Sequence, residues 1–361
     1  MLQGKCLQKM KFMDFCSGIG GGRTALENLG LECVGFSEID ELAERTYRLF
    51  FGYKEKNHGD LTKINPNELP YFDLMIAGFP CQAFSIVGKR RGIHDQRGTI
   101  IFGLIKILRA CQIKYFILEN VKGLIHHSGG KTLKIILDEL ELSGYQVYSK
   151  VLNSLYFGVP QMRERIYFIG VRNDILMNNE PFSFLKVAAP QDVRDYLIDD
   201  DEDYVFDETK PEYKTFLKYL DNKYNKGLYK PNRLLENEYL ILDTRQSDLR
   251  LYNNRVPTLR TGRHGIFYVK NGRFRKLSGF EALLLQGFPQ DLAKQTKNKI
   301  ADTLLLSQAG NAMTVKAIEE IARSFLFCFN VKNSTNRVFW GKNHFKRALG
   351  RMEQMFLPIT K

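Results

Sequence analysis

The stretch FMDFCSGIGGGR, residues 12–23, joins a short apolar run to a turn that is rich in glycine. Apolar runs of this length, bounded by turn residues, are typical of buried strands. Glycines placed after a strand allow a ligand to approach the backbone where the next helix begins. A simple tight turn has the same composition, so the stretch predicts a strand and a turn and leaves a binding role open.

Outward from this turn, strand-like and helix-like segments alternate through the first half of the chain. The strand-like segments lie at 33–38, 74–78, 115–120 and 166–171. Segments with apolar residues at helical spacing lie at 23–29, 41–51, 99–111 and 132–142. This alternation predicts an α/β fold with a doubly wound, mostly parallel sheet that helices cover on both faces. In such sheets, ligands bind at the carboxyl ends of the strands.

Charge and cysteine content narrow the class of protein. The chain has 361 residues, a formal net charge of +13 and a pI of about 9.3. This basic excess favours a polyanionic partner, most often nucleic acid, although a merely basic protein has the same composition. The six cysteines are scattered without a CxxC pair, so we expect reduced thiols, no metal and a cytoplasmic protein. The longest apolar segment, 100–108, is too short to cross a membrane, and we expect no signal peptide.

Two acidic residues would suit a nucleoside ligand. Glu38 lies twenty residues beyond Gly18, and an acid at this distance commonly binds ribose hydroxyls. A dinucleotide fingerprint would have its third glycine where Arg23 stands, so a nicotinamide cofactor is disfavoured and another nucleoside stays open. Asp60 follows a turn, but a helix N-cap before Thr62 is an equally good interpretation of this residue.

The segment AGFPCQAFS, residues 77–85, places Cys81 just after one predicted strand, and Glu119 lies at the end of another. In a parallel sheet both side chains would face one crevice. A thiolate that adds to carbon 6 of cytosine turns carbon 5 into a nucleophile, and a neutral carboxylic acid beside N3 stabilises the adduct. A lone cysteine is more often structural and a lone glutamate more often a helix cap. The pair at adjacent strand ends favours catalysis.

Seven ordered motifs resemble those of the bacterial-type DNA (cytosine-5)-methyltransferase family, over nearly the whole chain. They are DFCSGIGG (14–21), EID (38–40), GFPCQAFS (78–85), ENV (119–121), QMRERIYFIG (161–170), RVPTLRTG (255–262) and QAGNAMTV (308–315). The resemblance implies a Rossmann-like fold that uses S-adenosyl-L-methionine. Cys16 departs from the family pattern at an alanine-like position. Ala312 replaces the usual serine, which puts a hydroxyl contact in doubt.

The resemblance also implies catalytic roles for particular residues. Cys81 would attack carbon 6, and Glu119 would contact N3 and the exocyclic amine. Arg163 and Arg165 would position the base, the thiolate and a nearby phosphate.

The implied cofactor site draws on several motifs. Phe15 would stack on the adenine, and Glu38 would bind the ribose. Asp60 would bind the adenine amine, and Asn311 would close the site from the far end of the chain. The remaining residues of this implied site are Asp14, Gly18, Gly20, Gly21, Ile39, Leu61 and Pro80.

The strand–helix alternation stops near residue 182. We expect a catalytic domain at 1–181 that is completed by 308–335, an inserted target-recognition domain at 182–307, and a basic tail at 336–361 that either adds packing or touches DNA weakly. The residues expected to contact base edges in the major groove are Arg245, Gln246, Arg250, Arg260 and Arg263. The loop 85–98 is expected to act as a lid, with phosphate contacts from Lys89, Arg90, Arg91 and Arg97. The acidic run 199–203 is expected to be a solvated loop that faces away from DNA.

Taken together, the sequence predicts methyl transfer from S-adenosyl-L-methionine to carbon 5 of a cytosine in a specific double-stranded DNA sequence, with S-adenosyl-L-homocysteine as product. The reaction would pass through a Cys81–carbon 6 adduct of an extruded base. We expect a monomeric protective methylase of a restriction-modification system, with a genetically linked endonuclease that forms no stable complex. The alternatives left open are a tRNA cytosine-5 methyltransferase and a catalytically silent DNA-binding protein.

Overall fold

The computed structural model describes residues 9–80, 100–176, 182, 184 and 191–328. Its centre is a six-stranded sheet in the order β2-β1-β3-β4-β7-β5. The strands are β1 (Lys11–Phe15), β2 (Glu32–Ser37), β3 (Leu74–Gly78), β4 (Tyr115–Val121), β5 (Tyr145–Asn153) and β7 (Glu164–Arg172). β1 is parallel to β2 and β3, and β3 is parallel to β4, whereas β7 is antiparallel to both of its neighbours. The predicted mostly parallel α/β sheet is confirmed.

The connection before β7 explains why this strand runs against the others. Between β5 and β7 lie only the 3-10 helix η5 (Ser154–Phe157) and the short strand β6 (Gln161–Met162). A parallel crossover needs a dozen or more residues, so the chain turns back and β7 fills the gap between β4 and β5. β5 itself was not predicted, because exposed and buried side chains are mixed along it and it forms no apolar run.

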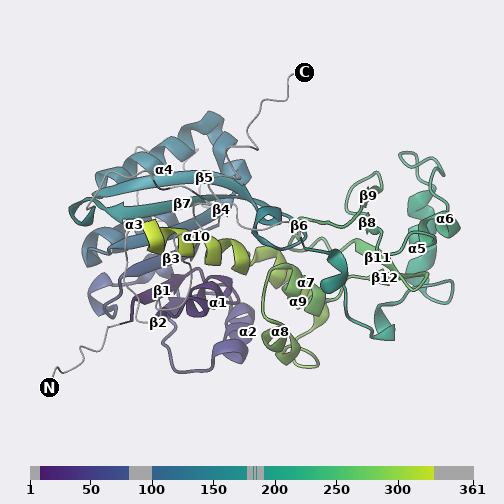
Figure 1. Ribbon diagram of the computed structural model, residues 1–361, viewed down its shortest axis with the longest axis horizontal. Helices are drawn as coiled ribbons and strands as arrows, with labels where there is room; N and C mark the ends of the chain where they lie inside the picture. The colour runs from purple at the N-terminus through teal and green to yellow at the C-terminus, as the bar shows by residue number, and fades with distance from the viewer. Residues whose placement is uncertain (1–8, 81–99, 177–181, 183, 185–190, 329–361) are drawn as a thin grey trace, which may run out of the picture.

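Helices cover both faces of the sheet, as predicted, because side chains alternate along each strand. Phe12 packs with α1 (Gly21–Asn28), α2 (Glu41–Phe51) and α10 (Val315–Cys328). Met13 packs on the opposite face with α3 (Ile100–Cys111) and α4 (Lys131–Leu142). α10 comes from the far end of the described chain and lies against α1 (Figure 1).

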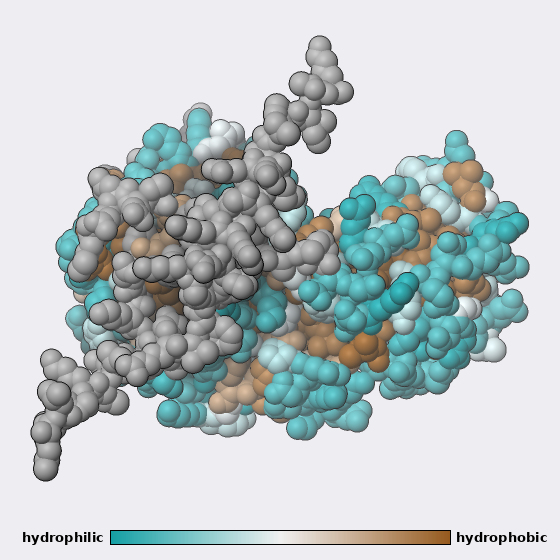
Figure 2. All heavy atoms as spheres, viewed as in Figure 1, coloured by the Kyte–Doolittle hydropathy of each residue, from teal (hydrophilic) through white to brown (hydrophobic). Residues whose placement is uncertain are grey.

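We call the six-stranded sheet and the helices that cover it the large lobe. A small lobe extends from one end of the large lobe (Figure 1). We define it as an antiparallel sheet in the order β12-β11-β8-β9, together with α5 (Pro211–Leu220) and α6 (Pro231–Leu235). Its strands are β8 (Ile241–Asp243), β9 (Arg250–Tyr252), β11 (Ile266–Lys270) and β12 (Arg273–Lys276). Its own apolar core includes Phe206, Phe216, Leu242 and Phe274. Hydrophilic residues cover most of its visible surface (Figure 2).

The remaining elements join the lobes. β6 pairs in parallel with β10 (Val256–Pro257), and α7 (Gly279–Leu285), α8 (Gln290–Gln295) and α9 (Asp302–Asn311) follow the small sheet. Phe50 of α2 packs on Phe288 with ring centroids 5.7 Å apart, so the region of α7–α9 also contacts the large lobe. The predicted domain boundaries stay a prediction. In the described residues the other short 3-10 helices are η1 (Leu61–Lys63), η2 (Pro66–Glu68), η6 (Asn173–Ile175), η7 (Val193–Asp195) and η8 (Glu202–Tyr204). The longer 3-10 segment η4 (Lys122–Gly130) is kinked at residues 127–129.

The acidic run 199–203 is exposed from Asp200 to Asp203, as predicted, and only Asp199 departs from the predicted solvated loop. The Asp199 carboxylate is 3 % exposed and lies 3.0 Å from Lys297 Nζ. Glu202 accepts two hydrogen bonds from the Arg273 guanidinium, at 2.7 and 2.8 Å. The run therefore forms ion pairs with basic residues of the small sheet and of the segment after α8. These partners lie about 70 to 100 residues further along the chain.

None of the helices in the described part of the chain is long and apolar enough to cross a membrane.

Candidate active site

The end of β3 is fastened to β4 just before the predicted nucleophile. Gly78 lies opposite Glu119 in the parallel register of these strands. The Phe79 N–H donates to the Glu119 carbonyl at 3.2 Å, and the Asn120 side chain donates to the Phe79 carbonyl at 2.9 Å. Asn120, which is 1 % exposed, was not singled out by the sequence analysis. Cys81 lies outside the described residues, and its role stays a prediction.

Glu119 and Arg165 lie together, as the resemblance implies. Arg165 Nε is 3.1 Å from Glu119 Oε1, and their side chains are 12 % and 9 % exposed. Glu119 Oε1 is buried and accepts no hydrogen bond from the described residues. Arg165 also donates to the Glu164 carbonyl at 2.8 Å, which fixes the guanidinium beside the carboxylate. The contact therefore holds the Glu119 carboxyl group in place and leaves its Oε1 able to accept a further hydrogen bond.

Arg165 contacts the Glu119 carboxyl group, whereas Arg163 contacts backbone carbonyls. It is 2 % exposed, and its guanidinium donates to the carbonyls of Leu259, Gly310 and Ala312 at 3.4, 3.1 and 2.8 Å. Burial, and to a smaller extent the charge of Arg165, lowers the pKa of Arg163 to about 9, so the group remains a cation at neutral pH. These contacts hold the segment after β10 and the end of α9 against the chain between β6 and β7, whereas a direct contact with the base stays a prediction.

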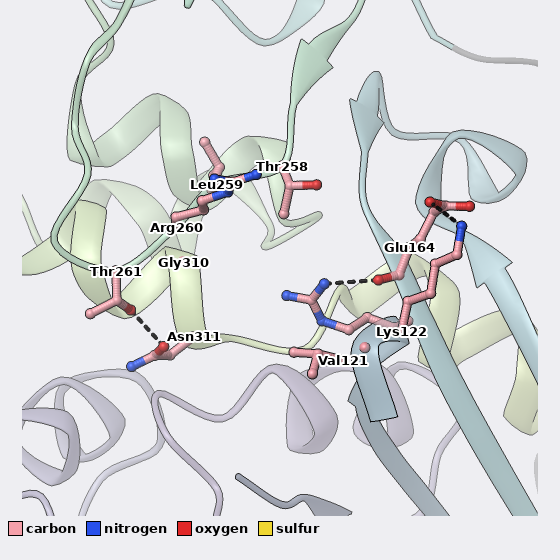
Figure 3. Close-up of a pocket in the computed structure, with 11 residues that line it drawn as sticks. Val121, Lys122, Glu164, Thr258, Leu259, Arg260, Thr261, Gly310 and Asn311 are labelled. Carbon is pink, nitrogen blue, oxygen red and sulfur yellow. Dashed lines mark hydrogen bonds and ion pairs between the residues drawn. The ribbon is translucent and has the colours of Figure 1, made fainter. Parts of the chain in front are cut away.

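A cavity of about 420 Å³ opens between the ends of β4 and β7, the segment after β10 and the end of α9. The residues that line it are Val121, Lys122, Gly123, Glu164, Arg165, Thr258, Leu259, Arg260, Thr261, Gly310 and Asn311. Figure 3 shows Lys122 and Glu164 on one wall, facing Thr261 and Asn311 across the cavity. The Thr261 hydroxyl donates to Asn311 Oδ1 at 2.5 Å, which joins the segment after β10 to the end of α9.

The glycine-rich turn is tied to the end of β2 through Glu38. Its Oε2 accepts from the Gly18 N–H at 2.7 Å, and its Oε1 accepts from the Ile39 and Asp40 N–H groups at 2.8 Å. Asn57 in turn accepts from the Glu38 N–H at 3.1 Å and donates to the Glu38 carbonyl at 3.0 Å. Asn57 could not be predicted from sequence, because no motif marks it and only the fold brings its segment alongside β2.

Asp14 is the most unusual group beside this turn. It is fully buried, and neither carboxylate oxygen has a hydrogen-bond partner among the described residues. Burial raises the pKa of this carboxyl well above its usual value. Because buried polar groups are nearly always hydrogen-bonded, a carboxyl left without a partner here is suited to a donor group or cation from a ligand.

Three other predicted cofactor residues have clear structural positions. Asp60 Oδ1 caps η1 by accepting from the Thr62 N–H at 3.0 Å and hydroxyl at 2.7 Å, and these hydrogen bonds lower the Asp60 pKa. Phe15 is fully buried and packs on Phe72, and Leu61 is 4 % exposed. Their proposed contacts with an adenine stay predictions. The helix-cap interpretation of Asp60 is confirmed. Pro80 is exposed at the edge of the described segment.

The motif at 308–315 packs against the motif at 14–21. Gly20 has φ of 86°, a conformation that favours glycine, and a Cβ on Gly21 would come 2.5 Å from the Met313 carbonyl oxygen. A Cβ on Gly310 would come 2.6 Å from the backbone of Arg260. Gly21 and Gly310 are therefore required for close packing of backbone segments. The glycine-rich turn is a packing site for the segment around Met313 as well as a change of chain direction.

This geometry agrees with what comparison with known proteins finds. Residues 10–326 match the family described as C-5 cytosine-specific DNA methylase. The chain belongs to that family. The chain is 35 % identical to the type II methyltransferase M.NgoBI of Neisseria gonorrhoeae over 91 % of its own length and 98 % of that protein. It is 33 % identical to the type II methyltransferase M.HhaI of Haemophilus parahaemolyticus over 93 % of its own length and 98 % of that protein.

A solved structure supports the fold of this methylase. The crystal structure of a putative DNA modification methyltransferase encoded within an Escherichia coli prophage superposes with a TM-score of 0.64 at 20 % identity, over 89 % of this chain and 100 % of that one. The predicted family and fold class are confirmed, and the protein is a DNA (cytosine-5) methyltransferase.

One predicted base-reading residue of the methylase is hydrogen-bonded within the protein. The Arg245 guanidinium is 3 % exposed, makes two hydrogen bonds to the Asp243 carboxylate at 2.7 and 2.9 Å, and donates to the Thr258 carbonyl at 2.8 Å. These hydrogen bonds link β8 to the segment after β10 and engage the Arg245 guanidinium within the protein, and base reading by Arg245 stays a prediction.

The other predicted DNA contacts of the methylase are less constrained. Arg250, Arg260 and Arg263 are exposed, and Gln246 is half-buried, so their roles as base readers stay predictions. The predicted phosphate contacts of the lid, Lys89, Arg90, Arg91 and Arg97, lie outside the described residues.

Proposed function

We propose that the cavity beside the ends of β4 and β7 receives a cytosine extruded from a specific double-stranded DNA sequence and that the enzyme methylates its carbon 5. The observation that carries this proposal is the buried Glu119–Arg165 pair beside a strand end that leads, within three residues, to Cys81. An extruded base is needed because carbon 6 is shielded inside a stacked duplex.

In this proposal Cys81 is the nucleophile, and Glu119 stabilises the ring to which Cys81 adds. The Cys81 thiolate forms a bond to carbon 6, and Glu119 hydrogen-bonds N3 and the exocyclic amine as electron density moves into the ring. Glu119 Oε1, which has no hydrogen bond from the described residues, supports this role. Arg165 keeps the carboxylate in place. After methylation, carbon 5 loses its proton to a base or water and the Cys81 sulfur leaves, which restores the ring.

S-adenosyl-L-methionine supplies the methyl group as an electrophilic carbon bound to sulfonium, and S-adenosyl-L-homocysteine is the product. The residues around the glycine-rich turn fit such a ligand. The unpartnered Asp14 carboxyl suits a donor or cationic group, and Glu38 retains acceptor capacity for ribose hydroxyls. Ile39 is 71 % exposed beside Glu38 and offers an apolar surface for a nucleoside.

We further infer that the enzyme acts as a monomer in the cytoplasm and protects DNA from a genetically linked restriction endonuclease. The net charge of +13 supports a nucleic-acid partner. The relatives M.NgoBI and M.HhaI are both named as type II methyltransferases, and this supports a role in restriction-modification. A tRNA substrate is the second candidate, and the assay below separates it from DNA.

The test measures transfer of a tritiated methyl group to duplex DNA and, in parallel, to tRNA. Cys81→Ser should abolish transfer, because a hydroxyl ionises far less readily than a thiol. The matched control is Cys111→Ser, since Cys111 lies at the end of α3 and its thiol contacts the Pro66 carbonyl. Bisulfite sequencing of DNA from expressing cells would identify the target. Label found only in tRNA, or substantial activity in Cys81→Ser, would refute the proposal.

A further inference from the structure

The wall of the cavity carries an ion pair to which no role has been assigned. Lys122 follows β4 directly, and its Nζ lies 2.9 Å from Oε2 of Glu164, the first residue of β7 (Figure 3). The two strands are antiparallel neighbours in which Val121 pairs with Arg165. The pair therefore lies at the cavity wall, close along both strands to Glu119 and Arg165.

The charges around the cavity make this pair unusual. Among the described residues that line the cavity, the cationic ones are Lys122, Arg165 and Arg260, and Glu164 is the one carboxylate. An uncompensated carboxylate at this wall would repel the phosphates of an incoming nucleic acid. In the protein alone, Lys122 neutralises Glu164, and this ion pair removes the repulsion. The ion pair also occupies the Lys122 ammonium, which could otherwise bind a phosphate.

The pair is also easily broken. The side chains of Lys122 and Glu164 are 49 % and 46 % exposed, and exposed ion pairs contribute little to folding stability. By contrast, Arg165 is 12 % exposed and is held by Glu119 and by the Glu164 carbonyl. Of the two cations on this wall, Lys122 is therefore the one that can change partner without disturbing the base-binding groups.

We propose that Lys122 exchanges the Glu164 carboxylate for a phosphate of the bound nucleic acid, with Glu164 acting as an internal competitor that weakens binding of every sequence alike. This inference rests on the proposed function, because it requires nucleic acid at this cavity. The exchange moves no covalent bond: one ion pair separates and another forms. Since Lys122 follows the strand of Glu119, the phosphate it binds would anchor the backbone beside the extruded base.

The experiment measures binding of a fluorescein-labelled mixed-sequence DNA duplex by anisotropy at several salt concentrations, using the full-length enzyme. Lys122→Gln should weaken binding by about twofold to fivefold and lower the slope of log K against log salt by about 0.9. Glu164→Gln should tighten binding by a similar factor. The double variant should lose the gain from Glu164→Gln, because no ammonium is left to bind phosphate.

Control variants come from a second exposed pair, which lies on α4 and does not line the cavity. Lys134 Nζ lies 3.0 Å from Asp138 Oδ2, with side chains 75 % and 49 % exposed. Lys134→Gln and Asp138→Asn change net charge in the same way as the test variants. They should leave duplex binding within about twofold of the unsubstituted enzyme.

Three results would overturn the exchange. The ion pair would have only a structural role if Glu164→Gln weakened duplex binding as much as Lys122→Gln did and the double variant had the same affinity as either single variant. It would be an incidental surface contact if neither substitution changed affinity or salt slope while the unsubstituted enzyme bound duplex normally. Failure of the unsubstituted enzyme to bind any duplex would instead refute the proposed function, and the exchange would fall with it.

Discussion

Replacing Arg163 by lysine should separate bracing of the active site from direct action on the base. Two guanidinium nitrogens of Arg163 donate to three backbone carbonyls, which belong to Leu259, Gly310 and Ala312. A lysine offers one nitrogen and a point charge in place of this fork, so it should lose the contacts of one nitrogen. The carbonyls it leaves behind are buried and would have no replacement donor from the protein.

The expected size of the effect follows from these contacts. A hydrogen bond to a charged group contributes about 1.5–3 kcal/mol net, and an abandoned buried acceptor costs about 1–3 kcal/mol. The contact to Leu259, at 3.4 Å, is long and should contribute least. We therefore expect Arg163→Lys to lower the free energy of unfolding by about 2–4 kcal/mol. With a urea m-value of about 3 kcal/mol/M, the unfolding midpoint should fall by about 1 M.

Urea unfolding followed by fluorescence, with methyl transfer measured on the same preparations, provides the assay. Arg165→Lys is the matched control, because Arg165 contacts Glu119 and one carbonyl at the cavity wall. It should shift the midpoint by less than about 0.5 M and still reduce transfer strongly. An Arg163→Lys enzyme that unfolded at the unsubstituted midpoint but had lost transfer would show that Arg163 acts on the base and that the bracing argument is wrong.

Three further predictions concern separate parts of the molecule. Glu119→Gln should slow single-turnover methyl transfer by about 10²–10⁴-fold, and a decrease below about tenfold would exclude Glu119 as the acid. Gly21→Ala should weaken binding of S-adenosyl-L-homocysteine in calorimetry, because its Cβ would come 2.5 Å from the Met313 carbonyl oxygen, whereas Gly123→Ala, with nothing within 4 Å of its Cβ, should leave that affinity unchanged. Burial raises the pKa of Glu281 from its usual 4.5 to about 7, so the native state binds more protons across this interval and the free energy of unfolding should fall as pH rises through it. The fall contributed by this group is at most about 3 kcal/mol, and Glu281→Gln should show a flatter pH dependence of the urea midpoint than the unsubstituted enzyme.

Local patterns predicted the class of fold and much of the candidate site. The segments 41–51 and 74–78 have the predicted bounds in the structure as α2 and β3, because apolar spacing and flanking glycines are local properties of the chain. The same reasoning missed β5, because its mixture of polar and apolar residues is typical of an exposed segment. β5 is a strand because β7 pairs with it along its whole length. The antiparallel direction of β7 also could not be predicted from its own apolar run.

Strand ends and motif order correctly placed Glu119 and Arg165 together, whereas the roles assigned to the site residues stay predictions. Glu119 and Arg165 were both assigned from motifs, and the register of β4 and β7 brings them to 3.1 Å. What the sequence could not determine is which charged groups are already satisfied within the protein. Arg245 resembles a base reader in sequence, yet its guanidinium is committed to Asp243 and to the Thr258 carbonyl.

Only the tertiary structure decided the partners of such charges. Arg163 donates to carbonyls 96 to 149 residues further along the chain, and Asp199 pairs with Lys297, which is 98 residues away. A charged side chain has the same local sequence signature whether it faces solvent, DNA or a buried carbonyl. Its partner is selected when distant segments pack, because desolvation forces each buried charge or carbonyl to find a group of opposite polarity. In this protein Arg165 and Lys122 line the cavity, whereas the guanidinium groups of Arg163 and Arg245 have partners within the protein.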